Sequence, residues 1–235
     1  MGISGHNTSI KAVAFDLDGT FYPNYRFYIR NILKFLLHPF FYTAFIKVRR
    51  ILHSFQYDQA QILPFYDRQA SLLADYLGKE PGIIRKKADI LIYGGLKKLF
   101  SGVKLFPHLK EVLSSFREAG LRLAVLSDFP PDEKLSILGL DSFFDVVISS
   151  EETGALKPSG IPFSALIGQL ALEPGEIIYV GNSMRFDVEG SKSAGMKAAL
   201  IRRGTLSTGH IPEKTTGKAD FVFRDYRQLQ EYILR

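Results

Sequence analysis

The sequence predicts an α/β protein in which a parallel sheet, covered by helices on both faces, is interrupted by a separate helical domain. Two observations carry this prediction. Short apolar segments alternate with helical patterns from residue 105 to the end of the chain, as in parallel sheets. Residues 21–104 show helical spacing instead. We therefore expect a core domain formed by residues 1–20 and 105–235, and a helical cap domain formed by residues 21–104.

The first predicted strand, residues 11–15, consists mainly of small and apolar residues and ends at two aspartates. Such a run is typical of a strand that is buried on both faces of a parallel sheet. Asp16 and Asp18 follow it directly, and residues i and i+2 at a strand end can face the same pocket. Two neighbouring carboxylates repel each other, so the pair indicates a bound cation or a shared proton. An aspartate-rich turn is the plain alternative.

The composition limits the possible chemistry. The chain has 235 residues, no cysteine and a formal net charge of +6. The absence of cysteine excludes disulfides, thiolate metal sites and a cysteine nucleophile, and it fits a cytoplasmic location. The first ten residues lack the basic and apolar regions of a secretory signal. The positive charge favours anionic partners, which include phosphorylated metabolites, nucleic acid and anionic membranes.

The segment after Thr20 is aromatic and basic. No acidic residue occurs between Asp18 and Asp58, and residues 28–51 form the longest apolar stretch of the chain. Basic side chains interrupt this stretch and Pro39 divides it, which argues against a transmembrane span. The pattern predicts two helices, one on each side of this proline.

These two helices have more than one interpretation. In the second helix, Phe41, Phe45, Val48 and Leu52 form one apolar face, which favours packing inside a cap. Residues 26–52 could also make a peripheral contact with an anionic membrane surface. Basic and aromatic residues together can bind single-stranded nucleic acid. Helical spacing is explained equally well by core packing, so we expect no nucleic-acid partner.

Helices and strands alternate from residue 105 onward. Before that point, helical spacing continues over residues 58–100, broken at Gly78 and at the glycine pair of residues 94 and 95. The predicted strands of the core are residues 121–126, 146–148, 177–180, 197–201 and 221–223. The predicted helices are residues 107–120, 132–138, 161–170 and 188–194, with a last helix from residue 226.

Three further polar clusters lie at predicted strand ends or in the loops that follow them. Ser127 ends the second core strand, Lys157 lies in the segment Gly-Ala-Leu-Lys-Pro, and Asn182 and Asp187 follow the strand of residues 177–180. The carboxyl ends of parallel strands meet at one edge of a sheet, so we expect these side chains to lie beside the two aspartates. Taken singly, they could be an exposed loop lysine, a serine helix cap and an aspartate that stabilises a helix N-terminus.

These residue types fit phosphoryl transfer. A carboxylate can accept the phosphoryl group as an aspartyl phosphate. A second carboxylic acid can protonate the leaving oxygen and later deprotonate water. Hydroxyl groups, backbone N–H groups and a lysine can hold phosphoryl oxygens, and Mg²⁺ prefers oxygen ligands.

The order and spacing of these motifs over residues 12–201 resembles the signature of the haloacid dehalogenase superfamily, with a helical cap inserted after the first motif, Asp-Leu-Asp-Gly-Thr. The resemblance implies a Rossmann-like core and a small phosphorylated substrate. It implies that Asp16 is the nucleophile and Asp18 the general acid/base. It further implies a substrate- and phosphate-binding set of Thr20, Ser127, Asp128 and Lys157, and a Mg²⁺ site around Asp16, Asp18, Asn182 and Asp187. The dehalogenases of the family lack an aspartate that matches Asp18, so this residue favours phosphate chemistry.

Two positions depart from the family pattern. Asp128 stands where asparagine is common, and Asn182 stands where the family usually has a metal-binding aspartate. The second change removes a negative charge, so we expect Mg²⁺ to bind more weakly, with Asp187 able to compensate. The histidines show no metal-ligand spacing and are interpreted as structural or surface residues.

The leading hypothesis is a magnesium-dependent phosphatase of a small phosphorylated metabolite that forms an aspartyl-phosphate intermediate. One alternative is a phosphomutase, which would transfer the same intermediate to a second hydroxyl group. Another is a catalytically weakened binding protein that docks on an anionic membrane or a partner through its basic aromatic cap. A nucleotide or nucleic-acid 5′-phosphate substrate also remains open, as does the oligomeric state.

Overall fold

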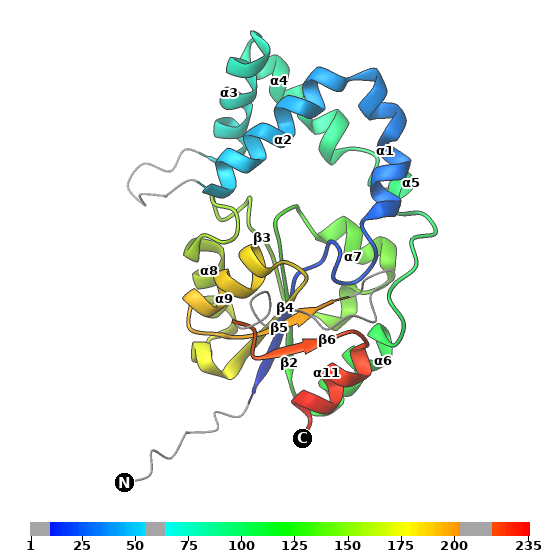
Figure 1. The fold of residues 1–235 in the computed structure, drawn as a ribbon, viewed down its shortest axis with the longest axis vertical. Coiled ribbons are helices and arrows are strands. Elements are labelled where there is room, and N and C mark those ends of the chain that lie inside the picture. Colours follow the sequence, from blue (N-terminus) through cyan, green and yellow to red (C-terminus); the bar gives the residue numbers. More distant parts are fainter. Residues whose placement is uncertain (1–9, 55–63, 203–217) are drawn as a thin grey trace.

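The protein has two parts, an α/β core and a helical cap that lies above it in Figure 1. The computed structural model describes residues 10–54, 64–202 and 218–235. Residues 1–9 of the expected N-terminal tail and residues 58–63 of the predicted helical pattern lie outside the described residues.

The core is built on a six-stranded sheet in the described part of the chain, with the order β3-β2-β1-β4-β5-β6. All neighbouring strands are parallel, as predicted. The strand order reverses at β1, because β2 and β3 lie on one side of it and β4 to β6 on the other. Ligands bind outside the carboxyl ends of the strands at such a point. The strands are β1 (Ala12–Phe15), β2 (Arg122–Ser127), β3 (Val146–Ser149), β4 (Ile177–Gly181), β5 (Lys197–Ile201) and β6 (Phe221–Phe223).

Helices cover both faces of the sheet (Figure 1). Val13 and Phe15 of β1 pack toward α6 (Leu109–Glu118), α7 (Asp132–Leu138) and α11 (Tyr226–Ile233). Ala12 and Ala14 point to the other face, where α8 (Gly160–Leu170) packs against the sheet. Successive residues of a strand face opposite sides, so this fully buried strand is apolar at every position, as the sequence predicted.

The cap buries an apolar cluster of its own, while the last helix of this segment, residues 96–100, packs into the core cluster instead. Phe41, Phe45, Val48 and Leu52 are buried in the cap cluster, which confirms the predicted apolar face of the second helix. The helices of the cap segment are α1 (Tyr25–Leu37), α2 (Pro39–Ser54), α3 (Phe65–Leu77), α4 (Pro81–Ala88), the π-helical η2 (Asp89–Tyr93) and α5 (Leu96–Phe100). No described helix is both long enough and apolar enough to cross a membrane.

One predicted helix takes a different form. Residues 184–189 form a π-helical segment, η5 (Met184–Glu189), and only Gly190–Ser193 form a regular helix, α9. The N–H groups of Asp187 and Val188 both donate to the Ser183 carbonyl oxygen, which widens this turn. Such π-helical turns occur frequently at functional sites. Short 3₁₀ turns, η3 (Asp141–Phe143) and η4 (Pro174–Glu176), lead into β3 and β4.

Candidate active site

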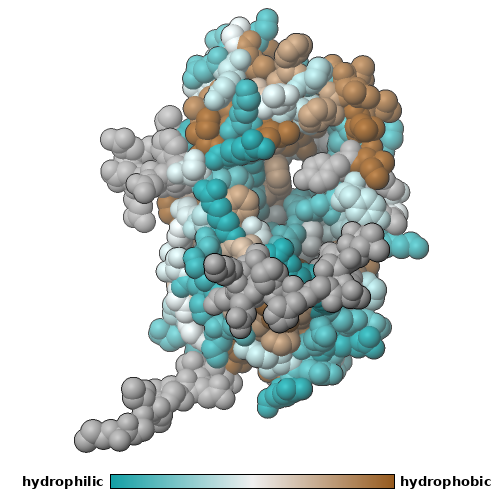
Figure 2. Space-filling view, viewed as in Figure 1, coloured by the Kyte–Doolittle hydropathy of each residue, from teal (hydrophilic) through white to brown (hydrophobic). Residues whose placement is uncertain are grey.

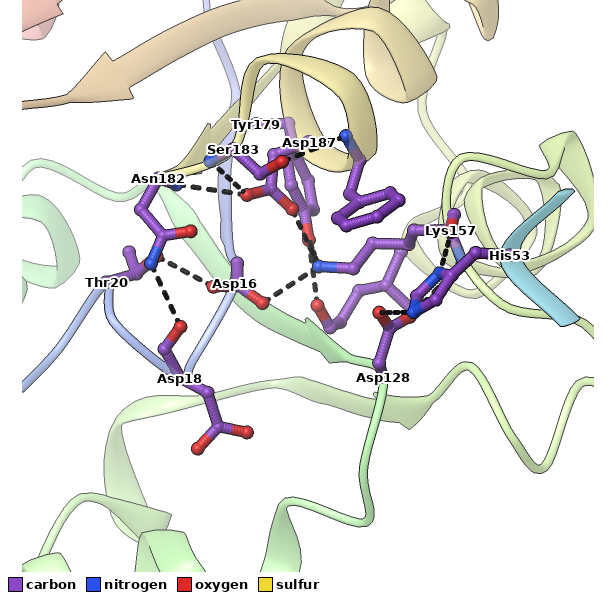
Figure 3. Close-up of polar contacts among 12 residues, drawn as sticks. Asp16, Asp18, Thr20, His53, Asp128, Lys157, Tyr179, Asn182, Ser183 and Asp187 are labelled. Carbon is purple, nitrogen blue, oxygen red and sulfur yellow. Dashed lines mark hydrogen bonds and ion pairs between the residues drawn. The ribbon is translucent and has the colours of Figure 1, made fainter. Parts of the chain in front are cut away.

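The predicted site residues meet at the carboxyl ends of β1, β2 and β4 (Figure 3). Gly19 brings the loop after β1 against the loop after β4: it has φ +87°, and a Cβ atom there would lie 1.9 Å from Asn182 Nδ2. A larger residue would displace the Asn182 side chain, and the positive φ itself favours glycine. This glycine thus allows the Asn182 side chain to lie against the loop that carries Asp16 and Asp18.

Asp16 is buried at the end of β1 between two hydrogen-bond donors. Its Oδ2 accepts a hydrogen bond from Thr20 Oγ1 at 2.8 Å, and its Oδ1 accepts one from Lys157 Nζ at 2.8 Å. Burial raises the pKa of Asp16 to about 7; the Lys157 ammonium opposes this rise, and the nearby Asp187 carboxylate adds to it. A carboxyl group with such a pKa is a candidate reactive group.

Lys157 is at the centre of the polar cluster and is only 2% exposed, so it is not an exposed loop lysine. Its Nζ donates to Asp16, to Asp187 Oδ1 at 2.7 Å and to the Tyr179 hydroxyl at 3.1 Å. Burial alone would lower the pKa of Lys157, but the carboxylates of Asp16 and Asp187 outweigh it and hold the pKa well above its usual value. Lys157 therefore remains a cation between two buried carboxyl groups, and the three side chains together carry a net charge of −1 when both carboxyl groups are ionised.

Asp187 connects this lysine to the loop after β4. Its Oδ2 accepts hydrogen bonds from the backbone N–H groups of Asn182 at 3.0 Å and Ser183 at 2.9 Å. A Cβ atom at Gly181 would lie 2.4 Å from the Asp187 carboxyl group, so this position also requires glycine. Both carboxylate oxygens of Asp187 have donors in this arrangement.

Asp18 turns its side chain away from Asp16 and its main-chain carbonyl toward Asn182 (Figure 3). The carbonyl oxygen accepts a hydrogen bond from Asn182 Nδ2 at 3.0 Å. The carboxylate accepts hydrogen bonds from Lys134 Nζ, at 2.6 Å from Oδ2, and from the Tyr22 hydroxyl. Sequence reasoning missed Lys134 and Tyr22, since nothing in the pattern of α7 or of the loop after Thr20 marks a side chain that returns to the site.

Buried serine hydroxyl groups lie at the ends of β2 and β3. Ser127 pairs with Ser149 in the sheet register, and the Ser150 N–H donates to the Ser127 carbonyl at 2.7 Å. Within the described residues, the hydroxyl oxygens of all three serines are buried without a hydrogen-bond partner. Unpaired buried hydroxyls are costly, so they are candidate ligand-binding groups.

Asp128 and His53 hold the Lys157 loop from outside. Asp128 Oδ1 accepts a hydrogen bond from the Lys157 backbone N–H at 3.1 Å, and His53 Nδ1 donates to the Lys157 carbonyl at 2.6 Å. The His53 ring also stacks on Phe186 with 4.3 Å between the ring centres. Burial lowers the pKa of His53, while Asp128 opposes this shift. The histidine therefore has a structural role, in which α2 of the cap contacts the core.

A buried ion pair makes a second contact between cap and core. Arg49 of α2 pairs with Glu151, which follows β3, and its guanidinium carbon lies 4.2 Å from the centre of the Phe129 ring. The Tyr93 hydroxyl donates to Glu151 Oε1 at 3.1 Å, and Gln69 Nε2 donates to the Tyr93 hydroxyl at 3.0 Å. Burial raises the pKa of Glu151, and Arg49 opposes the rise. This contact was not predicted, because its partners lie about a hundred residues apart.

The described part of the site offers few negatively charged ligands to a metal ion. In the described part of the chain, no three acidic or histidine side chains are grouped as a metal ion would require. Lys157 occupies the space between Asp16 and Asp187, and the Asp18 side chain faces Lys134. The Asp16 carboxylate, the Asp18 carbonyl and the Asn182 side-chain oxygen remain as hard oxygen donors, which fits a Mg²⁺ ion that keeps several water ligands.

Comparisons with known proteins agree with this geometry. The family model for haloacid dehalogenase-like hydrolases matches residues 10–195. The glyceraldehyde 3-phosphate phosphatase of Methanopyrus kandleri is 31% identical over 230 residues, covering 95% of this chain and 97% of the relative. The phosphoglycolate phosphatase of Haemophilus influenzae strain 86-028NP is 27% identical, with 95% and 98% covered. These relatives confirm the enzyme class expected from the sequence, a phosphoric monoester hydrolase.

Solved structures give the same fold. A phosphatase of this superfamily from Thermococcus onnurineus has a TM-score of 0.61 and 25% identity, covering 95% of this chain and 98% of that one. The L-2-haloacid dehalogenase of Xanthobacter autotrophicus has a TM-score of 0.64 and 21% identity, covering 96% and 98%, and it supports the fold alone. By its motifs, its fold and these relatives, the chain belongs to the haloacid dehalogenase-like hydrolase family.

Proposed function

We propose that the protein is a cytoplasmic, magnesium-dependent phosphatase that hydrolyses a small phosphorylated metabolite through an aspartyl phosphate on Asp16. The observation that carries this proposal is the position of Asp16, buried at the strand end within 2.8 Å of the Lys157 ammonium. The named activities of the relatives, on glyceraldehyde 3-phosphate and on phosphoglycolate, support a small phosphorylated substrate.

In the first step, a carboxylate oxygen of Asp16 attacks the phosphorus atom, and the bond from phosphorus to the leaving oxygen breaks. Lys157 reduces the repulsion between the Asp16 carboxylate and the anionic phosphate. The unpartnered Ser127 hydroxyl is suited to donate a hydrogen bond to a phosphoryl oxygen. Thr20 keeps the Asp16 carboxylate oriented during this attack.

Asp18 moves the protons of the reaction. As a carboxylic acid it protonates the leaving oxygen, and as a carboxylate it then takes a proton from the water that hydrolyses the aspartyl phosphate. Asp16, the Asp18 carbonyl and Asn182 would hold the magnesium ion. When bound, this ion offsets charge on the phosphoryl group. The cap, joined to the core by Arg49 and His53, would exclude water from the first step.

The test is hydrolysis of p-nitrophenyl phosphate by wild type and by Asp16→Asn, with magnesium and with EDTA. Turnover should require magnesium and should be lost in the variant. Asp220→Asn is a matched control, since Asp220 is exposed and pairs with Lys192 away from the site. Turnover that survives Asp16→Asn, or that is unchanged by EDTA, contradicts the proposal.

A further inference from the structure

The face of α1 directed away from the rest of the cap is apolar. Its members are more than half exposed, with Leu37 at 74% and Phe40, at the start of α2, at 83%. Figure 2 shows the apolar surface of this region in brown at the upper right, where α1 lies in Figure 1. We refer to it as the α1 face, formed by Tyr25, Ile29, Ile32, Leu33, Leu36, Leu37 and Phe40.

The exposed side of α1 is apolar, which is unusual for a helix on a protein surface. Tyr25, Ile29, Ile32 and Leu36 recur at spacings of three and four residues, so they share one side of the helix. Asn31 lies on the opposite side and is buried. A surface helix normally directs its apolar side to the core and its polar side to water. Packing against the described residues therefore does not account for the apolar side of α1.

Charge identifies the kind of surface that this face would contact. Residues 21–104 contain 14 Lys and Arg and 5 Asp and Glu, a formal charge of +9, so the rest of the chain carries −3 within the total of +6. Lys47 and Arg50, on the following helix, are exposed. They follow Phe40 by seven and ten residues, so they lie on roughly the same side of α2 as this member of the α1 face. An exposed apolar face combined with exposed cations is typical of a helix that lies in the interface of an anionic membrane.

A second copy of the chain fits the α1 face less well than an anionic membrane does. A twofold contact would place the same positively charged cap on both sides of the interface, and like charges across an interface oppose association. A spanning orientation is also not available to α1, which has 13 residues.

We propose that the α1 face docks the protein on an anionic lipid surface, with α1 parallel to the membrane plane. This inference goes beyond the proposed phosphatase function and does not depend on it. The apolar side chains would enter the headgroup region, while Lys47 and Arg50 would contact the anionic headgroups. Raising the salt concentration should weaken the attraction of the cations.

The test is flotation of the full chain with phosphatidylcholine vesicles, with and without about one-third phosphatidylglycerol. We expect binding only to the anionic vesicles, and a loss of about tenfold or more in affinity in Leu33→Asn/Leu36→Asn, because two aliphatic side chains that would enter the membrane become polar. Lys47→Glu/Arg50→Glu should lose a similar factor. The matched control is Ile83→Asn/Leu234→Asn, at exposed apolar residues outside α1, and it should bind like wild type.

Far-UV circular dichroism and the midpoint of urea unfolding report whether each variant is folded, independently of any phosphatase activity. Equal binding to neutral vesicles, or binding that persists in both the apolar and the charge variants, overturns the proposal. No binding of the wild type to anionic vesicles overturns it as well. A concentration-dependent dimer that is lost in Leu33→Asn/Leu36→Asn would instead assign the α1 face to a second copy of the chain.

Discussion

Lys134 Nζ lies 2.6 Å from Asp18 Oδ2, and the Tyr22 hydroxyl donates to the other oxygen of the same carboxylate. Both donors are buried. Burial and the adjacent Asp18 carboxylate raise the pKa of Tyr22 well above its usual value, so Tyr22 remains a donor. The orientation of the proposed acid/base is therefore set by α7 and by the loop that follows Thr20, and not by a helix of the cap.

The first prediction concerns this orientation. Lys134→Met should lower kcat for an aryl phosphate by about tenfold with little change in KM, because a misplaced acid/base slows the chemical step without removing substrate contacts. Tyr22→Phe should give a smaller loss of the same kind. Steady-state kinetics and the pH profile of kcat check both. Lys192→Met, which removes an exposed ion pair with Asp220, is the control. A rise in KM at constant kcat would assign Lys134 to substrate binding.

The second prediction concerns the metal. Asn182→Asp adds a negative charge beside the Asp18 carbonyl and should lower the magnesium concentration that gives half-maximal activity by about tenfold. Asn182→Ala separates this charge effect from the loss of the hydrogen bond to Asp18, and it should not tighten magnesium binding. Titration of activity with magnesium measures both variants. An unchanged magnesium dependence in Asn182→Asp would mean that residue 182 does not contact the ion.

The third prediction is that the proposed nucleophile destabilises the fold. The folded-state pKa of Asp16, about 7, lies above its usual value of 3.8 because of burial. The folded state therefore binds the proton more tightly, and stability is lost as pH rises from about 4 to about 7. Asp16→Asn leaves a neutral Lys157–Asp187 pair. It should be more stable than wild type by about 2–4 kcal/mol at pH 8 and similar to it at pH 4.

Urea unfolding in EDTA at the two pH values measures this difference. EDTA is needed because a metal ion bound to Asp16 would lower the pKa of its carboxyl group and reduce the effect. Asp220→Asn should show no comparable gain at pH 8. Equal stability of Asp16→Asn and wild type at pH 8 would contradict a strongly raised pKa at Asp16.

The parts of the molecule that follow from local pattern were predicted from the sequence. The buried strand before Asp16 is apolar at every position because both of its faces are covered, and alternation with helices requires a parallel sheet. A parallel sheet brings its carboxyl strand ends to one edge. The sequence alone therefore predicts that Asp16, Lys157 and Asp187 lie together, and both carboxylates accept hydrogen bonds from the Lys157 ammonium group.

The contacts made between distant segments could not be predicted. Lys134 is a lysine in a helix, and nothing in its neighbours distinguishes it from an exposed one. Arg49 belongs to a basic stretch that suggests a solvated or lipid-facing side chain, yet it is buried against Phe129 and paired with Glu151. The exposed apolar side of α1 is similar: its apolar spacing is visible in the sequence, but the side that faces the protein is not.

The last prediction tests the ion pair between cap and core. In Arg49→Met, Glu151 stays buried without its cation, so its pKa should rise further above its usual value of 4.5. The folded state then favours protonated Glu151, and the cost of the substitution increases as pH rises above about 4.5. We expect a loss of about 3 kcal/mol in the free energy of unfolding at pH 8 and a much smaller loss at pH 5.

The double variant Arg49→Met/Glu151→Gln separates charge from packing. It has no buried charge at this contact, and the introduced amide would keep an oxygen that can accept the Tyr93 hydrogen bond. Its free energy of unfolding at pH 8 should therefore be close to that of wild type, and the difference from wild type should no longer depend on pH. Lys192→Met, at an exposed pair, should cost less than about 1 kcal/mol at either pH. If the stability cost of Arg49→Met is as small and as independent of pH as that of Lys192→Met, Glu151 is not held as a buried carboxylate. The hydrogen bond from His53 to the Lys157 carbonyl would then be the more important polar contact between α2 and the core.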